Sequence, residues 1–192
     1  MGDPKLRKKF YRKPSHPWQK ERIDEEKELL QSYGLKNKTE LWKVDSLLKN
    51  YMRQAKRLIA SSGDQADKEK SQLLKKLHGF GFISPDGKVE DVLTITLKDV
   101  LDRRLQTIVH KLYFSRTVRQ ARQFISHEHI FVGDHKITSP GYLITTDEEP
   151  TVSFTPSSSL AQADHPERAP VEKETGKASE GSVEGTASEE GS

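Results

Sequence analysis

Three arginines and a glutamine within seven consecutive residues have the clearest chemical use in this sequence. They are Arg116, Arg119, Gln120 and Arg122. A guanidinium group presents a planar fork of donors that matches the oxygens of a phosphate. These residues fall at the start of a predicted helix, where free backbone N–H groups also attract anions. The cluster therefore predicts a surface that binds a phosphate backbone.

A second basic cluster lies near the N-terminus. Its cations are Lys5, Arg7, Lys8, Lys9, Arg12 and Lys13. Prolines at positions 4, 14 and 17 interrupt any helix there, and Phe10, Tyr11 and Trp18 lie among the charges. Cations neutralise phosphates while flat rings can stack on bases, so residues 1–22 are interpreted as an extended RNA-binding arm. A solvated terminus without a ligand is the alternative interpretation.

Three histidines raise the question of a metal site. His127, His129 and His135 have only Glu128 and Asp134 as neighbouring carboxylates, and the chain has no cysteine. Structural zinc sites usually need four Cys or His ligands, so we expect no metal and no other cofactor. No nucleophile and base have a suggestive spacing, and we therefore do not expect an enzyme.

Composition limits the class of protein. Of the 192 residues, 32% are hydrophobic and 32% are charged, which allows a modest core but not a large compact enzyme. No apolar run is long enough to cross a membrane, and a chain without cysteines fits a reducing cytoplasm. Residues 157–192 carry three basic and eight acidic side chains, a net charge of −5. Because the whole chain has a net charge of +3, residues 1–156 have a net charge of +8. This asymmetry indicates a basic body and a solvated acidic tail.

Helical periodicity dominates residues 23–96. A short helix should end near Tyr33, because Gly34 follows it as a C-terminal cap. Apolar residues at three-to-four spacing predict a long helix from Thr39 to about Leu58, whose lysines and arginines are expected to be solvated. A third helix should follow Asp64, and residues 84–87 read as a turn.

The region 97–154 predicts a compact unit of two helices and short strands. Leu101, Leu105, Ile108 and Leu112 fall on one helical face, and a second helix should begin at Thr117 with Gln120 completing a capping box. Strands are expected at 130–132, 136–138, 142–144 and 151–154. The predicted fold class is α+β, in four parts: a basic arm (1–22), a helical body (23–96), a module of two helices on a short antiparallel sheet (97–154) and a disordered acidic tail (155–192).

Four segments of that unit resemble the S-four RNA-binding domain, a module named after the fourth protein of the small ribosomal subunit. They are residues 101–105, 115–125, 127–134 and 139–142. The order Gly133-Asp134 departs from the usual Asn-Gly, and Glu128 stands where glycine commonly precedes the second histidine. The resemblance extends to the archaeal-type S-four ribosomal protein family over residues 1–154, through segments 1–5, 16–23, 33–38 and 99–110.

The resemblance implies a function and a set of site residues. Members of this family bind 16S-type small-subunit rRNA as primary binders in the cytoplasm and nucleate assembly of the subunit body. They lie near the messenger RNA entry and touch ribosomal neighbours involved in decoding accuracy. The implied RNA-facing positions are Arg103, Arg104, Arg116, Arg119, Gln120, Arg122, His127, His129 and Lys136.

Recognition of RNA shape and phosphates is the expected mechanism, because side chains cannot easily enter the deep, narrow major groove of folded RNA. Arg116, Arg119 and Arg122 would bind phosphates bidentately, with Lys136 as a point charge. Two alternatives stay open at this point. One is a stand-alone S-four-domain RNA-binding protein of the heat-shock type, and the other is a helical scaffold that binds acidic proteins.

Overall fold

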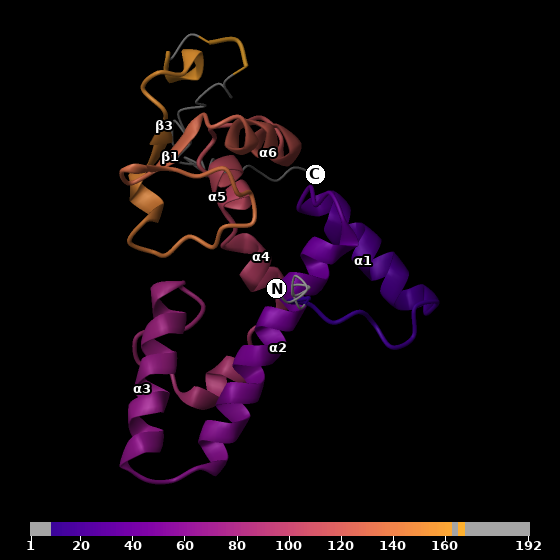
Figure 1. Ribbon diagram of the computed structural model, residues 1–192, viewed down its shortest axis with the longest axis vertical. Helices are drawn as coiled ribbons and strands as arrows, with labels where there is room; N and C mark the ends of the chain where they lie inside the picture. Colours follow the sequence, from indigo (N-terminus) through magenta and orange to yellow (C-terminus); the bar gives the residue numbers. More distant parts are fainter. Residues whose placement is uncertain (1–8, 163–164, 168–192) are drawn as a thin grey trace, which may run out of the picture.

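The protein is elongated, with a helical hairpin at one end and a small α+β module at the other (Figure 1). The structure, a computed structural model, describes residues 9–162 and 165–167. The hairpin consists of α2 (Lys38–Ala60) and α3 (Asp64–Gly79), and α1 (Lys20–Ser32) packs beside the first half of α2. No helix in the described part of the chain combines the length and apolar character needed to cross a membrane. The predicted α+β class is confirmed.

The hairpin core follows from the periodicity of α2. Leu48, Tyr51, Ala55 and Leu58 are buried on the face that meets Leu73 and Leu77 of α3 and Val92 of the 3-10 helix η1 (Val89–Leu93). Each buried Leu contributes roughly 1.5–3 kcal/mol by leaving water. The predicted helix began at Thr39 and the observed one begins at Lys38, with Asn37 as its N-cap residue. The observed helix ends at Ala60 and the predicted one at about Leu58, so periodicity located α2 to within about two residues at each end.

A second cluster joins the hairpin to the rest of the chain. Leu35 and Leu41 are buried against Leu101, with residues of α1 packed on them. The chain turns at Gly34, whose φ of +57° is favoured by glycine. A Cβ here would lie 3.0 Å from the Nε2 atom of Gln106 and 3.1 Å from Val118 Cγ1. This turn therefore brings the body into close contact with the module.

The structure corrects the single helix predicted over residues 101–112. Two helices occur instead, α4 (Leu97–Asp102) and α5 (Leu105–Lys111). Arg104 between them is extended and pairs with Leu143 in an isolated antiparallel bridge, and the backbone N–H of Leu105 donates to the Tyr142 carbonyl at 2.7 Å. Residues 142–144, predicted as a sheet strand, use their hydrogen bonds here. The apolar residues keep helical spacing across 101–112, but backbone pairing with residues 142–144 interrupts the helix.

The module contains α5, α6 (Val118–Ser126) and a three-stranded antiparallel sheet. The strands are β1 (Ile130–Val132), β2 (His135–Lys136) and β3 (Val152–Phe154), in the order β2-β1-β3. The alternation in β1 buries Ile130 and Val132 while Phe131 is only half-buried, as predicted. The buried residues of the two helices and the sheet form one core, and the inner face of α6 packs in it.

The tail begins later than predicted. Residues 155–162, expected to be disordered, form a turn and the 3-10 helix η3 (Ser159–Ala161). Leu160 is only 3% exposed and belongs to the module core, and the Thr155 N–H donates to the His129 carbonyl at 2.8 Å. Burial of the Leu160 side chain in the module core orders this segment, although most residues around Leu160 are polar. Residues 163–164 and 168–192 of the predicted tail lie outside the described residues.

Candidate nucleic-acid interface

The first turn of α6 is tied down by side-chain hydrogen bonds. The Thr117 hydroxyl accepts from the backbone N–H of Gln120 at 3.2 Å, and the Gln120 side-chain oxygen accepts from the backbone N–H of Arg116 at 2.8 Å. The predicted pairing of Thr117 with Gln120 is present, although the amide reaches Arg116 rather than the N-cap residue itself. These bonds stabilise the turn from which the basic side chains project.

Arg116 and Arg119 are exposed at this end of the helix, opposite the buried Ala121 and Ile125. Ion pairs between described residues do not involve Arg119. We define the α6 surface as Arg116, Arg119 and Gln120. Its three side chains come from one helical turn and can reach neighbouring phosphates of a folded RNA backbone.

Residues 165–167 lie across part of the α6 surface. The Arg116 guanidinium donates to the Pro166 carbonyl, and the Gln120 side-chain amide donates to the Glu167 carbonyl at 2.8 Å. Both acceptors are main-chain oxygens. RNA that contacts Arg116 and Gln120 must therefore displace this segment from them.

Arg122 lies on a different side of α6 from the one expected. Its guanidinium forms a bidentate pair with Glu40 of α2, with Nη2 2.7 Å from Oε1 and Nη1 3.1 Å from Oε2. The sequence-based interpretation placed this fork on the outer face, ready for phosphate. In the structure a carboxylate of the same chain occupies both of its outer nitrogens.

Two further arginines expected to face RNA are bound to other residues of the chain, and of these Arg104 is buried and Arg103 is half-buried. Arg104 is 3% exposed, and its Nη2 donates to Glu40 Oε2 at 2.9 Å. Arg103 binds Glu149 at 2.7 Å and the Ile144 carbonyl at 3.3 Å. The break between α4 and α5 turns these side chains toward the body and the module, whereas a continuous helix would have exposed them. Arg104 is therefore an interior residue in this structure, whereas it was expected on the outer surface, and its contact with RNA stays a prediction.

Glu40 forms ion pairs with two guanidinium groups at once. Burial acts to raise the pKa of Glu40. The hydrogen bonds from Arg122 and Arg104 and the charges of both arginines lower it by more, so the net pKa lies below its usual value. Burial lowers the pKa of Arg104, and the bond to Glu40 opposes that change. The two directions differ: the lowered pKa of Glu40 favours its charged form, whereas the lowered pKa of Arg104 reflects the cost of burying its guanidinium. Both groups are charged at neutral pH because their usual pKa values lie far on either side of it. Nothing in the sequence around Glu40 marked this role, since an acidic residue in a first helical turn is common.

The remaining predicted positions of the module lie at its edge. His127 is exposed with its ring stacked at 6.3 Å on His129, whose Nδ1 lies 2.8 Å from the Ser158 hydroxyl. Lys136 is exposed and lies 4.0 Å from the Glu128 carboxylate. His127 and Lys136 are thus accessible to a ligand, whereas His129 is held by Ser158. Within residues 9–162 and 165–167, no three His, Asp or Glu side chains are grouped as metal ligands.

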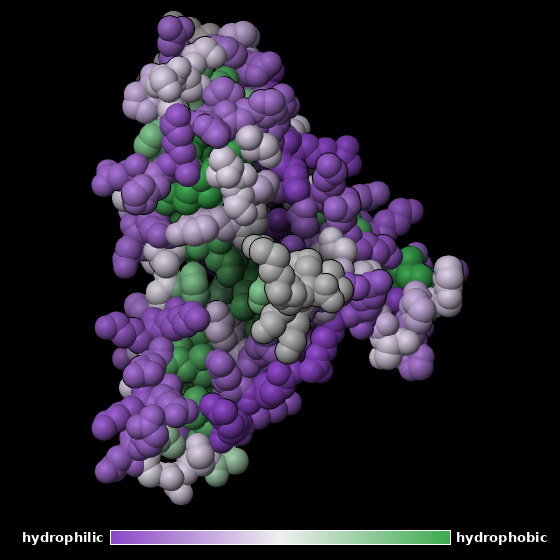
Figure 2. All heavy atoms as spheres, viewed as in Figure 1, coloured by the Kyte–Doolittle hydropathy of each residue, from purple (hydrophilic) through white to green (hydrophobic). Residues whose placement is uncertain are grey.

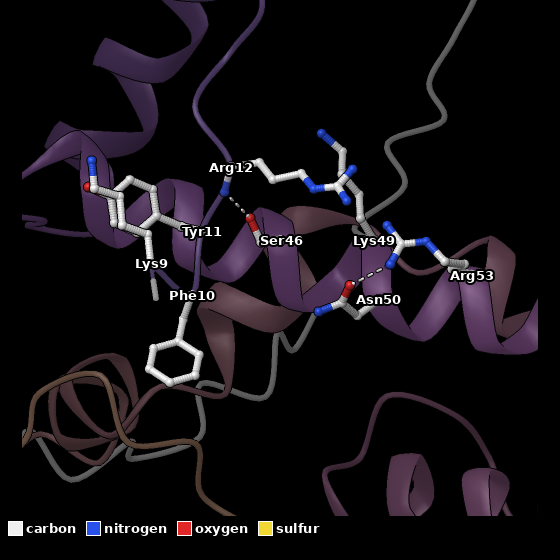
Figure 3. A pocket seen from close by; sticks show the side chains of 8 residues that line it. All are labelled: Lys9, Phe10, Tyr11, Arg12, Ser46, Lys49, Asn50 and Arg53. Atoms are coloured by element: carbon white, nitrogen blue, oxygen red, sulfur yellow. Dashed lines mark hydrogen bonds between the residues drawn. The ribbon is translucent and has the colours of Figure 1, made fainter. Parts of the chain in front are cut away.

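A second basic surface forms where the arm crosses α2 (Figure 3). The Arg12 N–H donates to the Ser46 hydroxyl at 3.0 Å, and the ring of Tyr11 lies 6.2 Å from that of Trp42. Together with α2 the arm lines a groove of about 250 Å³. We define the arm groove by its four cations, Lys9, Arg12, Lys49 and Arg53.

Figure 3 shows Arg12, Lys49 and Arg53 on one side of the arm, with Phe10 pointing away from them. Phe10 is 86% exposed, so its ring is available for stacking. Lys49 and Arg53 were expected to be merely solvated. Their spacing with Ser46 places all three on one face of α2, a signal that could have paired them with the arm. Lys13 is also exposed, and Lys5, Arg7 and Lys8 lie outside the described residues.

Polar surface covers most of the face shown in Figure 2, and hydrophobic residues show through in places within the module, along the hairpin and between the two. A surface of this kind suits an anionic, hydrated partner better than an apolar one.

Comparison with known proteins finds one domain family and several relatives that share one name. Residues 103–149 match the S4 domain family. The small ribosomal subunit protein uS4 of Methanococcus aeolicus is 44% identical over 169 residues, covering 88% of this chain and 96% of the relative. The protein of the same name from Methanothermobacter thermautotrophicus is 45% identical over 160 residues, covering 83% of this chain and 94% of the relative. The similarity therefore includes the helical body as well as the module.

Proposed function

The chain belongs to the family of small ribosomal subunit protein uS4, and we propose from this that it is a structural component of the small ribosomal subunit that binds rRNA. The observation that carries the proposal is the α6 surface, which projects from a capped helical turn within the segment that matches the S4 domain. The helical body favours this function over that of a stand-alone module, because the relatives match through it.

Phosphate contacts by Arg116 and Arg119 are the central part of the proposed mechanism. Both guanidinium groups lie at the N-terminal end of α6, where the helix dipole also favours an anion. Gln120 can donate to a 2′-hydroxyl or a base edge once the Glu167 carbonyl is displaced. His127 and Lys136 extend the contact along the edge of the module.

The arm groove supplies the second contact. Its four cations attract the RNA backbone, and Phe10 offers a ring for an unpaired base. Two surfaces on one chain raise the affinity, because binding at one holds the RNA near the other. We extend the proposal to Lys5, Arg7, Lys8 and Lys13 as further phosphate ligands of the arm.

Several finer roles complete the proposal. We infer that the protein binds 16S-type rRNA early, nucleates assembly of the subunit body, and contacts neighbouring proteins that support decoding accuracy, with messenger RNA near the entry site. Its location would be the cytoplasmic ribosome. Its relatives are named as ribosomal proteins, and the proposal includes no catalytic step.

Salt-dependent binding tests the proposal. Arg119→Ala should weaken binding to small-subunit rRNA and reduce the slope of log K against log salt by about one, the value for one lost phosphate contact. Footprinting of the full chain on the rRNA would then show protection lost near the α6 contact. Lys75→Ala is the matched control, because Lys75 is exposed on α3, away from both surfaces. Equal slopes for both variants and the unaltered protein would refute the role of the α6 surface.

A further inference from the structure

One carboxylate connects three elements that are distant in sequence. Glu40 lies in the first turn of α2, Arg104 lies at the junction before α5, and Arg122 lies in α6. The three hydrogen bonds from the Nη atoms of Arg104 and Arg122 to the carboxylate oxygens of Glu40 are between 2.7 and 3.1 Å long. The helical body is thereby joined to the module by charged hydrogen bonds, the stronger class of such bonds.

A buried amide extends this connection. Gln106 is 1% exposed, and its Nε2 donates to the carbonyls of Val118 at 2.9 Å and Gly34 at 3.2 Å. Its side-chain oxygen lies 3.4 Å from Arg122 Nη1. The first turn of α6 is therefore attached to the turn between α1 and α2 at one point and to α2 itself at another.

These contacts fix the rotation of α6 about its axis. Arg122 is bound to Glu40 of α2, whereas Arg119, its neighbour three residues earlier on the helix surface, is exposed. The side chain of Arg122 is 25% exposed and that of Glu40 is 20% exposed, so little of either fork remains open to a ligand. The pair with Glu40 takes an N–H of each Nη atom of Arg122, and the Gln106 side-chain oxygen lies 3.4 Å from Nη1, so a phosphate could meet this guanidinium only on the side of Nε and Nη2.

We propose that Arg122 is a positioning residue rather than a phosphate ligand, and that Glu40 is its anchor on the body. Together they hold the α6 surface at a fixed place relative to the arm groove. The proposal rests on the proposed rRNA binding and adds which arginines of α6 contact the RNA. Its consequence is that two basic surfaces meet a folded RNA in one preset geometry, which preserves the gain from double contact.

Arg122→Gln separates a positioning role from a phosphate contact. The variant keeps Glu40 paired with the buried Arg104, so no buried charge is left uncompensated and folding should be retained. Affinity for small-subunit rRNA should fall about tenfold at every salt concentration, while the slope of log K against log salt stays that of the unaltered protein. Arg119→Gln serves as the matched variant, and its slope should fall by about one.

Arg122→Lys gives a second measurement. Lysine keeps the charge but lacks the planar fork, so it cannot replace the bidentate pair with Glu40. Its rRNA affinity should resemble that of Arg122→Gln if Arg122 positions α6. A phosphate contact would instead depend on the charge, so the slope of log K against log salt would be kept in Arg122→Lys but reduced in Arg122→Gln.

Each outcome decides the inference. A parallel loss of affinity in Arg122→Gln and Arg122→Lys, with unchanged slopes, supports it. A reduced slope in Arg122→Gln, or no change of affinity in a folded variant, overturns it. If Arg119→Gln also leaves the slope unchanged, the proposed function fails at the α6 surface, and this result is distinguishable because it involves a different residue.

Discussion

The arm groove and the α6 surface are both basic, but they differ in how their cations are held. Arg119 projects from α6 and Arg116 lies just before the N-cap of that helix, whose inner face, including Ile125 at 0% exposure, lies in the module core. The arm is held by the hydrogen bond from Arg12 to Ser46 and by the contact of Tyr11 with Trp42. Fixing an extended segment costs roughly 1–2 kcal/mol per residue, and these two contacts offset little of it.

This difference suggests different contributions to RNA binding. A helix seated in a packed core presents donors at fixed positions, which suits recognition of the shape of a folded RNA. An extended arm with a few anchors supplies charge and can follow the backbone it meets. Affinity should therefore depend on both regions, whereas the choice of RNA site should depend mainly on the α6 surface.

The largest expected effect comes from the core beneath α6. Ile125→Ala should lower the free energy of unfolding by about 2–5 kcal/mol, because the cavity cannot be filled in a close-packed module. Tyr11→Ala in the arm should change it by less than about 1 kcal/mol. Urea unfolding at one salt concentration measures both. Similar losses would show that the arm is as firmly packed as the module.

The next effect concerns the anchor of α6 and its pH dependence. Glu40→Gln should cost about 2–3 kcal/mol at neutral pH, below the roughly 3–5 kcal/mol of a fully buried broken pair, because Glu40 is partly exposed. The pKa of Glu40 is lowered in the folded protein from 4.5. Its contribution is therefore complete above about pH 4.5 and is lost as the pH falls through the lower folded value. Unfolding curves of the two proteins should converge in acid.

Asp45→Asn is the matched control for that measurement. Asp45 pairs with Lys49 at 2.7 Å beside the arm groove, and both side chains are partly or largely exposed. Such a pair contributes at most about 1 kcal/mol, so this variant should track the unaltered protein across the pH range. If Glu40→Gln behaved like Asp45→Asn, the pair with Arg104 and Arg122 would carry no special stability.

A smaller effect is expected from the arm groove. Combined Arg12→Ala, Lys49→Ala and Arg53→Ala substitutions should leave stability nearly unchanged and lower rRNA affinity by about tenfold to a hundredfold. The salt slope should fall by about two to three. Titration of labelled rRNA at several salt concentrations measures both quantities. An altered footprint at the α6 contact would contradict the independence of the two regions.

The smallest effect concerns the turn between α6 and β1. Glu128 has a φ of +63°, in the left-handed region that favours glycine. Glu128→Gly should raise the free energy of unfolding by up to about 1 kcal/mol, since it removes the crowding of Cβ. Glu128→Ala keeps the Cβ and should give no gain. Thermal unfolding of both variants checks the result, and equal melting temperatures would disprove the strain.

Local patterns predicted most of the elements. The periodicity of α2, the cap of α6 at Thr117 and the alternation in β1 each reflect contacts within a few residues, so the sequence is enough to find them. The helix break at Arg103 and Arg104 was not predictable in this way, because it depends on pairing with residues 142–144. The burial of Leu160 likewise depends on packing against residues of α5, α6 and the sheet, which are distant from it in the sequence.

Residue types and order by themselves determined that this chain is a basic α+β protein with an S4-type module and two groups of cations suited to phosphate. Only the tertiary structure decided which arginines remain available. Arg119 and Arg122 are alike in type and lie on the same short helix, yet one is exposed and the other is bound to Glu40. The reason is that a carboxylate 82 positions away in the chain is brought to one side of α6 by packing, and no local pattern encodes that approach.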